Sequence, residues 1–120
     1  MENDKRPNVL LDLSYDFALA IVNFSRHLQK EEKEFVLSKQ VLRSGTAIGA
    51  LSEEAQQAES KADFIHKLAI ANKEAHETHY WLRLIKDSSI STEVDDLIEK
   101  SEGLKRLLVS IIKSSKMRAV

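Results

Sequence analysis

Hydrophobic residues recur every three to four positions along most of the chain, in four segments separated by polar stretches. The first segment covers roughly residues 9–29, just after Pro7, and its steps of 3, 4, 4, 3 and 4 follow one face of an α-helix. That face consists of Leu10, Leu13, Phe17, Ile21, Phe24 and Leu28. The charged cluster at residues 30–33 is expected to form the turn that follows.

The second segment covers roughly residues 33–58 and has an unusual middle. Its hydrophobic stripe consists of Phe35, Leu37, Val41, Leu42, Ile48, Leu51 and Ala55. Gly45 and Gly49 stand four positions apart within it, and each costs about 1 kcal/mol relative to alanine in a helix interior. Two interpretations remain open: the small residues let another helix approach closely, or the helix breaks at residues 44–50.

The third segment has the strongest start signal in the chain. Ser60 stands three residues before Asp63, as in a capping box, and the hydrophobic pattern then runs from Phe64 to about residue 86. A serine-rich loop follows at residues 87–91. Ser91 or Thr92 is expected to cap the fourth helix, with Glu93 and Asp95 in its first turn. Its stripe consists of Val94, Leu97, Ile98, Leu104, Leu108, Ile111 and Ile112, with Gly103 as a weak point.

Four amphipathic helices with short connections predict an all-α protein, an antiparallel up-and-down four-helix bundle that forms a single domain over residues 1–120. No segment shows the alternating pattern of a strand. No hydrophobic run approaches the roughly 20 residues of a membrane-spanning helix, and the N-terminus lacks the pattern of a secretory signal. We therefore expect a cytoplasmic location and no membrane partner.

The charge balance is nearly neutral overall but uneven along the chain. Lys and Arg number 18 against 19 Asp and Glu, and the absence of cysteine excludes disulfides and thiolate chemistry. Residues 31–60 hold six acids and three bases, whereas the end of the chain from residue 105 is basic without an acid. This basic end either complements a helix C-terminus or contacts nucleic-acid phosphates. The candidate contacts are Lys105, Arg106, Lys113, Lys116 and Arg118.

No pattern of catalytic or metal-binding residues stands out. A di-iron bundle site needs two Glu-x-x-His motifs, and the third segment offers Glu74, His76, Glu77 and His79 without a Glu three positions before a His. Neither a nucleophile elbow nor a glycine-rich phosphate loop accompanies the hydroxyl and histidine side chains. We therefore predict a protein that is not an enzyme and that holds no metal and no cofactor.

Two groups of polar and aromatic residues have a structural and a functional interpretation. Arg43, Ser44 and Thr46 either pair with a neighbouring helix and with helix carbonyls or form a polar seam at a subunit interface or ligand groove. Tyr80 and Trp81 either pack in a core or interface or stack on bases.

Additional hydrophobic residues on the first and third segments favour burial in an oligomer. They are Leu11, Ala18, Ala20, Val22, Ile65, Ala69, Ile70 and Trp81. The oppositely charged regions also suit contact between copies of the chain.

The segment from Phe35 to Ala50 resembles the second helix of the bacterial four helix bundle protein family, which includes proteins encoded in intervening sequences of large-subunit ribosomal RNA genes. The family's Arg-Ser-x-x-Ser-Ile core corresponds to residues 43–48, with Ala47 in place of the second serine, and its Glu-Ala pair to Glu54-Ala55. Residues 61–71 and 73–82 are similar to the family's third helix. Leu51-Ser52 replaces an Asn-Ile pair that is common in the family.

This resemblance implies an antiparallel bundle that assembles into a homopentamer. The family is similar to the accessory protein of diversity-generating retroelements, a basic pentamer that binds nucleic acid and a reverse transcriptase, whereas the net charge here is −1. We expect a non-enzymatic homopentameric scaffold or binding module, with RNA binding through the basic C-terminal surface as the alternative. The expected interface or motif residues are Arg43, Ser44, Gly45, Thr46, Ile48, Gly49, Glu54, Tyr80 and Trp81.

Overall fold

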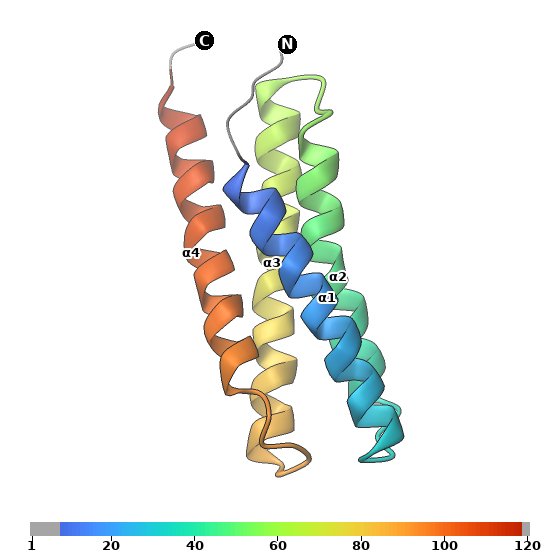
Figure 1. Ribbon diagram of the computed structural model, residues 1–120. Helices are drawn as coiled ribbons and strands as arrows, with labels where there is room; N and C mark the ends of the chain where they lie inside the picture. Colours follow the sequence, from blue (N-terminus) through green and yellow to red (C-terminus); the bar gives the residue numbers. More distant parts are fainter. Residues whose placement is uncertain (1–7, 119–120) are drawn as a thin grey trace.

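The computed structural model describes residues 8–118, which form four helices and no strand. They are α1 (Val9–Lys30), α2 (Leu37–Ala55), α3 (Lys61–Asp87) and α4 (Asp95–Met117). The all-α four-helix prediction is confirmed. Consecutive helices run in opposite directions, so that α1 begins and α4 ends at the same end of the bundle (Figure 1). Pro7, expected just before the first helix, lies outside the described residues.

The helices surround one hydrophobic core. Each packs on its neighbours in the order α1, α2, α3, α4 and back to α1, and the contact between α1 and α4 is the least extensive. The largest fully buried hydrophobic side chains are Phe17, Ile21, Leu28, Val41, Ile48, Leu68, Leu82, Ile85, Val94 and Leu108. Leu13 was expected in this core but is 48% exposed. It lies on the flank of α1 that faces α4, where the packing is loose.

α2 is shorter than the predicted range 33–58 at both ends. Lys33 has a φ of 57°, which is outside the helical region, and the carboxylate of Glu34 accepts hydrogen bonds from the amides of Val36, Leu37 and Ser38. This carboxylate therefore caps the helix, which begins at Leu37. Phe35 precedes the helix and is half-exposed rather than part of its stripe. At the other end the helix stops at residue 55, and the next amides bond carbonyls only three residues back.

The predicted start of α3 is confirmed, whereas that of α4 is wrong. The Ser60 hydroxyl accepts a hydrogen bond from the Asp63 amide at 3.0 Å. Ser91 and Thr92 do not cap α4, because that helix begins at Asp95 and its N-cap residue makes no side-chain capping bond. The Ser91 hydroxyl instead accepts a hydrogen bond from the Glu93 amide within the preceding turn. As a result, Glu93 also lies outside the helix.

α2 continues through both glycines, so the alternative of a helix break at residues 44–50 is wrong. A Cβ on Gly45 would lie 2.9 Å from both γ carbons of Ile21, and one on Gly49 would lie 3.3 Å from the carbonyl oxygen of Ser14. The missing side chains let α1 and α2 approach closely at these two positions. Gly103 of α4 differs, because a Cβ there would meet no atom within 4 Å.

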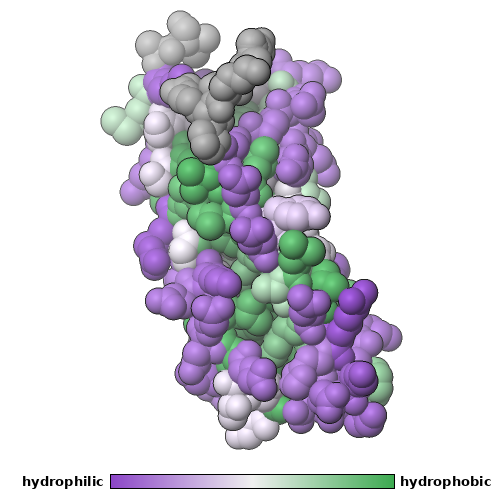
Figure 2. Space-filling model, in the orientation of Figure 1, coloured by the Kyte–Doolittle hydropathy of each residue, from purple (hydrophilic) through white to green (hydrophobic). Residues whose placement is uncertain are grey.

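The bundle is elongated, with extents of 50 × 23 × 20 Å. Figure 2 shows hydrophobic surface along α1 and along the line where α1 faces α4. Among residues 8–118, no helix is long and apolar enough to cross a membrane.

Candidate functional site

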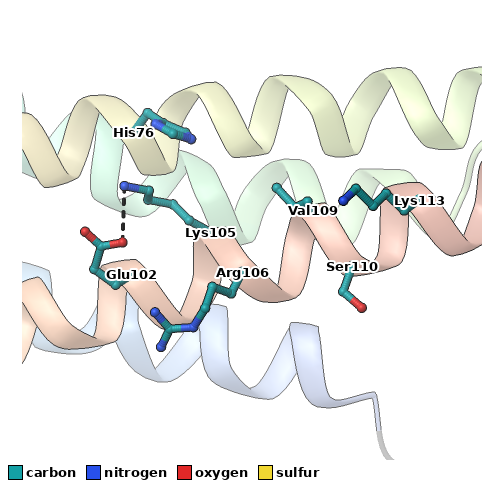
Figure 3. Close-up of a pocket in the computed structure, with 7 residues that line it drawn as sticks. All are labelled: His76, Glu102, Lys105, Arg106, Val109, Ser110 and Lys113. Carbon is teal, nitrogen blue, oxygen red and sulfur yellow. Dashed lines mark ion pairs between the residues drawn. The ribbon is translucent and has the colours of Figure 1, made fainter.

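A shallow groove lies between α3 and α4 and collects basic side chains. Its volume is about 520 Å³, and Figure 3 shows His76 of α3 facing the other lining residues, which lie along α4. They are His76, Glu102, Lys105, Arg106, Val109, Ser110 and Lys113. We call this surface the basic groove. It brings together three of the five predicted phosphate contacts, whereas Lys116 and Arg118 are not among its lining residues.

Glu102 and Lys105 of the basic groove form a network of ionisable groups with His79 of α3. Lys105 Nζ lies 3.3 Å from a Glu102 carboxylate oxygen and 3.4 Å from His79 Nδ1. His79 Nε2 lies 2.8 Å from the other Glu102 oxygen. Burial and the charge of Lys105 lower the pKa of His79. Burial raises the pKa of Glu102, but the hydrogen bond from Lys105 and the nearby positive charges outweigh this effect and the pKa is lowered.

Two further cations of the basic groove, Arg106 and Lys113, form no ion pair with the described part of the chain. Arg106 and Lys113 are exposed, and among residues 8–118 neither has a carboxylate within 4 Å. Among the described residues, Glu102 is the only acid in the lining, and it already contacts Lys105. The groove therefore presents a net positive surface to whatever covers it.

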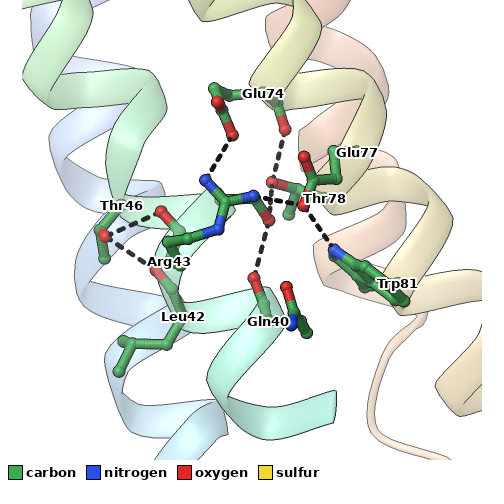
Figure 4. A network of polar contacts seen from close by, with 9 residues as sticks. Gln40, Leu42, Arg43, Thr46, Glu74, Glu77, Thr78 and Trp81 are labelled. Atoms are coloured by element: carbon green, nitrogen blue, oxygen red, sulfur yellow. Dashed lines mark hydrogen bonds and ion pairs between the residues drawn. The ribbon is translucent and has the colours of Figure 1, made fainter. Parts of the chain in front are cut away.

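The predicted motif on α2 forms a polar cluster with α3 (Figure 4). Arg43 Nη1 lies 3.3 Å from Glu74 Oε1, and Nη2 donates a hydrogen bond to Glu77 Oε2. The same Glu77 oxygen accepts a hydrogen bond from the indole N–H of Trp81 at 2.9 Å. Arg43 therefore pairs with acids on a neighbouring helix, which is the structural interpretation of the motif. The hydrogen bonds that Trp81 and Arg43 donate lower the pKa of Glu77, and the hydrogen bond that Arg43 donates to Glu77 raises the pKa of Arg43.

Buried hydroxyl groups continue this cluster into the bundle. The Thr78 hydroxyl donates to Ser44 Oγ at 2.9 Å, and the Ser44 hydroxyl donates to the Gln40 carbonyl at 3.1 Å. Ser44 and Thr78 are both fully buried. The Thr46 hydroxyl donates to the Leu42 carbonyl at 2.7 Å. These hydroxyl groups satisfy helix carbonyls and join α2 to α3.

The other motif residues separate into interior and surface positions. Ile48 is fully buried, and Gly45 and Gly49 face α1. Glu54 is exposed on α2. The half-exposed ring of Tyr80 packs edge-on against Trp81, with centroids 5.3 Å apart.

The four residues considered for a metal site do not converge. Glu74 and Glu77 contact Arg43 of α2, whereas His79 contacts Glu102 of α4. Within the part of the chain that the structure describes, no three His, Asp or Glu residues are close enough to hold a metal ion.

Sequence reasoning missed a hydrophobic seam between α1 and α4. A cavity of about 260 Å³ opens there, lined by Leu13, Asp16, Phe17, Lys100, Gly103 and Leu104. Leu13 and Gly103 gave the available signals, since Leu13 is a hydrophobic member of the stripe of α1 and Gly103 leaves space in α4. Neither signal could show that the two positions face each other.

The sequence profile described as 23S rRNA-intervening sequence protein matches residues 7–110. The chain belongs to this family. The match includes α1, α2 and α3 and extends along α4 to Ser110, so that Lys113, Lys116 and Arg118 lie beyond it.

A solved structure supports membership of the 23S rRNA-intervening sequence protein family. It is a protein of unknown function from the S23 ribosomal protein family of Bacteroides thetaiotaomicron, and it is 51% identical to this chain with a TM-score of 0.85. The alignment covers 87% of this chain and 98% of the other. No curated protein matches the chain. The four-helix fold is therefore shared with this relative.

Proposed function

We propose that this member of the 23S rRNA-intervening sequence protein family is a non-enzymatic, self-assembling scaffold or binding module of the cytoplasm, and that its working form is a homopentamer. The observation that carries the proposal is the exposure of hydrophobic side chains on α1. Leu13, Tyr15 and Leu19 are 48%, 61% and 49% exposed although the opposite side of the same helix fills the core. A helix that is apolar on more than one face suits burial in an assembly.

The α1–α4 seam supports the same proposal. Leu13 and Leu104 line an open cavity, and Gly103 leaves space that no atom of the described chain fills. Exposed hydrophobic surface with charged residues at its edge is typical of protein interfaces, and here Asp16 and Lys100 provide the charges. The number of copies rests on the family resemblance, and the exposed surface supports assembly as such.

Light scattering tests the assembly directly. At micromolar concentration we expect a mass of about five times 13.6 kDa. The double variant Leu13→Ser/Leu19→Ser should lower this mass, because it removes exposed hydrophobic groups from α1. Phe35→Ser/Val36→Ser is the matched control, since both residues are comparably exposed in the loop before α2. A wild-type mass of 13.6 kDa would contradict the proposal.

RNA binding is a second candidate function, favoured by one observation. Lys105, Arg106 and Lys113 lie together in the basic groove, and Glu102 is the one acid among its described lining residues. We expect Arg106→Gln and Lys113→Gln each to reduce the salt dependence of binding to structured RNA by about one unit of slope. Lys39→Gln is the control, because Lys39 is exposed on the distant helix α2. Binding that is absent at low salt or independent of salt would contradict this function.

A further inference from the structure

The outer surface of α1 carries a gradient of charge along one stripe. Asp12 and Asp16 stand in its first half, and residues 9–19 contain no base. Arg26 and Lys30 stand in its second half, and residues 20–30 contain no acid. The stripe follows helical spacing, and all of its members are exposed. It consists of Asp12, Asp16, Leu19, Asn23, Arg26 and Lys30.

α4 carries a second gradient with helical spacing. Its first half, residues 95–102, holds four acids and one base, whereas residues 103–117 hold four bases and no acid. The outer stripe of α4 consists of Asp95, Glu99, Glu102, Arg106, Ser110 and Lys113. Helix dipoles favour acids in a first turn and bases in a last turn, which accounts for Asp95 and Lys116. They do not account for Asp16, Glu102 or Arg106, which lie farther inside their helices.

The two gradients are opposed in space. α1 and α4 run in opposite directions, so the acidic half of α1 and the basic half of α4 lie at the same end of the bundle (Figure 1). The basic half of α1 and the acidic half of α4 lie together at the other end. Nevertheless, no ion pair within 4 Å joins α1 to α4 among residues 8–118. The opposite charges of α1 and α4 therefore do not neutralise each other through direct ion pairs within the described part of one chain.

The two stripes also face largely different sides of the molecule, although Asp16 of the α1 stripe additionally lines the α1–α4 cavity. Asp12, Tyr15 and Asp16 line a groove with Glu53 of α2, whereas Arg106 and Lys113 line the basic groove between α3 and α4. α1 does not pack on α3, and α2 does not pack on α4, so the α1–α2 side and the α3–α4 side are opposite faces of the bundle. One copy can thus offer each face to a different neighbour.

We propose that neighbouring copies pack side by side in the same orientation, with the α1–α2 face of one against the α3–α4 face of the next. This inference rests on the proposed self-assembly and specifies the two faces that form the contact between copies. Asp12 and Asp16 of one copy then meet Arg106 and Lys113 of the next at one end. At the other end, basic residues of α1 meet acidic residues of α4. The opposite orientation places acid against acid and base against base, which costs free energy.

Size, apolar content and symmetry favour a second copy as the occupant. A long side of a 50 × 23 × 20 Å bundle can supply the roughly 800 Å² per partner of a standard interface. Tyr15 and Leu19 on one face and Val109 on the other are exposed hydrophobic residues that can form an apolar centre between the charges. Contact between two different faces is heterologous, and a closed ring with an odd number of copies requires that kind of contact.

Charge reversal tests the arrangement, with mass measured by light scattering and folding by circular dichroism. Asp12→Lys/Asp16→Lys should reduce the wild-type oligomer to monomers, because two basic faces then oppose each other. Arg106→Glu/Lys113→Glu should also reduce the oligomer to monomers, because two acidic faces then oppose each other. A chain with all four changes should recover the wild-type mass, because both faces have exchanged their charges. Glu59→Lys is the control, since Glu59 is exposed in the loop between α2 and α3 and belongs to neither stripe.

Each outcome distinguishes this inference from the proposed function. A monomeric wild-type chain contradicts self-assembly itself and the inference with it. An oligomer that keeps its mass in both reversal variants overturns the inference alone. Loss of mass without recovery in the fourfold variant also overturns it, because the charges then do not act as pairs across the interface. If reversal at Arg106 and Lys113 abolishes RNA binding but leaves the mass unchanged, the basic groove belongs to RNA and the inference is wrong.

Discussion

The glycines of the bundle show how the surroundings decide the effect of one methyl group. Gly45 faces Ile21, whose side chain is branched at the Cβ and fully buried. The γ carbons of Ile21 therefore cannot easily move away from an added methyl group. Gly103 faces the open α1–α4 seam. Alanine is favoured over glycine in a helix interior by about 1 kcal/mol at either position. Only at Gly45 does the added methyl group clash with a neighbour, Ile21, and this steric cost opposes the gain in helix propensity.

Alanine substitutions at the two glycines should therefore change stability in opposite directions. Overpacking costs about 1–3 kcal/mol, so Gly45→Ala should lower the free energy of unfolding by roughly 1 kcal/mol after the gain in helix propensity. Gly103→Ala should raise it by about 1 kcal/mol. Urea denaturation of the two variants checks both signs. Equal effects would show that helix propensity alone governs these sites.

Glu77 should make stability depend on acidic pH. Its pKa is lowered in the folded chain by the hydrogen bonds from Trp81 and Arg43. The folded state thus binds its proton less readily than the unfolded state, and the stabilisation is complete above the ordinary carboxyl pKa of about 4.3. It is lost as the pH falls through the lowered value. The difference in unfolding free energy between the wild type and Glu77→Gln should be constant near neutral pH and shrink below about pH 4.

A control residue separates this effect from general acid denaturation. Glu93→Gln removes a carboxylate that is exposed in the loop before α4. The difference between the wild type and this variant should not follow the pH profile of Glu77→Gln. If both differences have the same profile, the contacts of Glu77 with Trp81 and Arg43 do not affect its titration.

At the scale of helices, periodicity predicted the number and type of elements but not every boundary. Ser60 was found because serine at an N-cap is a local signal. The start of α2 was missed because Glu34 caps it from three residues before the helix, after a residue with positive φ. The start of α4 was missed because buried Val94 stands at the N-cap position without a capping side chain. Tertiary packing therefore sets that boundary.

The capping role of Glu34 gives a prediction for α2. Its carboxylate accepts three amide hydrogen bonds, at 3.2, 3.0 and 2.7 Å. Glu34→Ala should lower the free energy of unfolding by about 1–2 kcal/mol, because it leaves the first amides of the helix without these acceptors. Glu31→Ala is the control, since Glu31 is exposed at the end of α1. If the two variants are equally stable, Glu34 does not stabilise α2 by capping it.

At the scale of the whole molecule, the sequence could not show which distant residues meet. Arg43 contacts Glu74 and Glu77, which are 31 and 34 residues away, and only the packing of α2 on α3 selects these partners. In the same way, the sequence showed that the C-terminal stretch is basic. Which of its cations enter the basic groove depends on how α4 is rotated about its axis, and the sequence did not show this. The open α1–α4 seam depends on how α1 crosses the bundle.

Self-assembly should also make thermal stability depend on protein concentration. An oligomer that dissociates on unfolding gains stability with concentration by mass action, so Tm should rise between 1 and 100 µM. High salt should weaken this dependence, because ionic screening shortens the range of the interfacial charges. Asp12→Lys/Asp16→Lys should show a constant Tm. Differential scanning calorimetry at several concentrations is the measurement, and a constant Tm for the wild type would contradict assembly.

The position of the helix ends has a consequence for chain connectivity. α1 begins and α4 ends at the same end of the bundle, while the loops at residues 31–36 and 88–94 lie at the opposite end (Figure 1). A linker can join the two ends, and new termini can be opened in the loop between α1 and α2. Such a circular permutant should keep the same four-helix packing, because the bundle depends on which helices touch and not on where the chain starts.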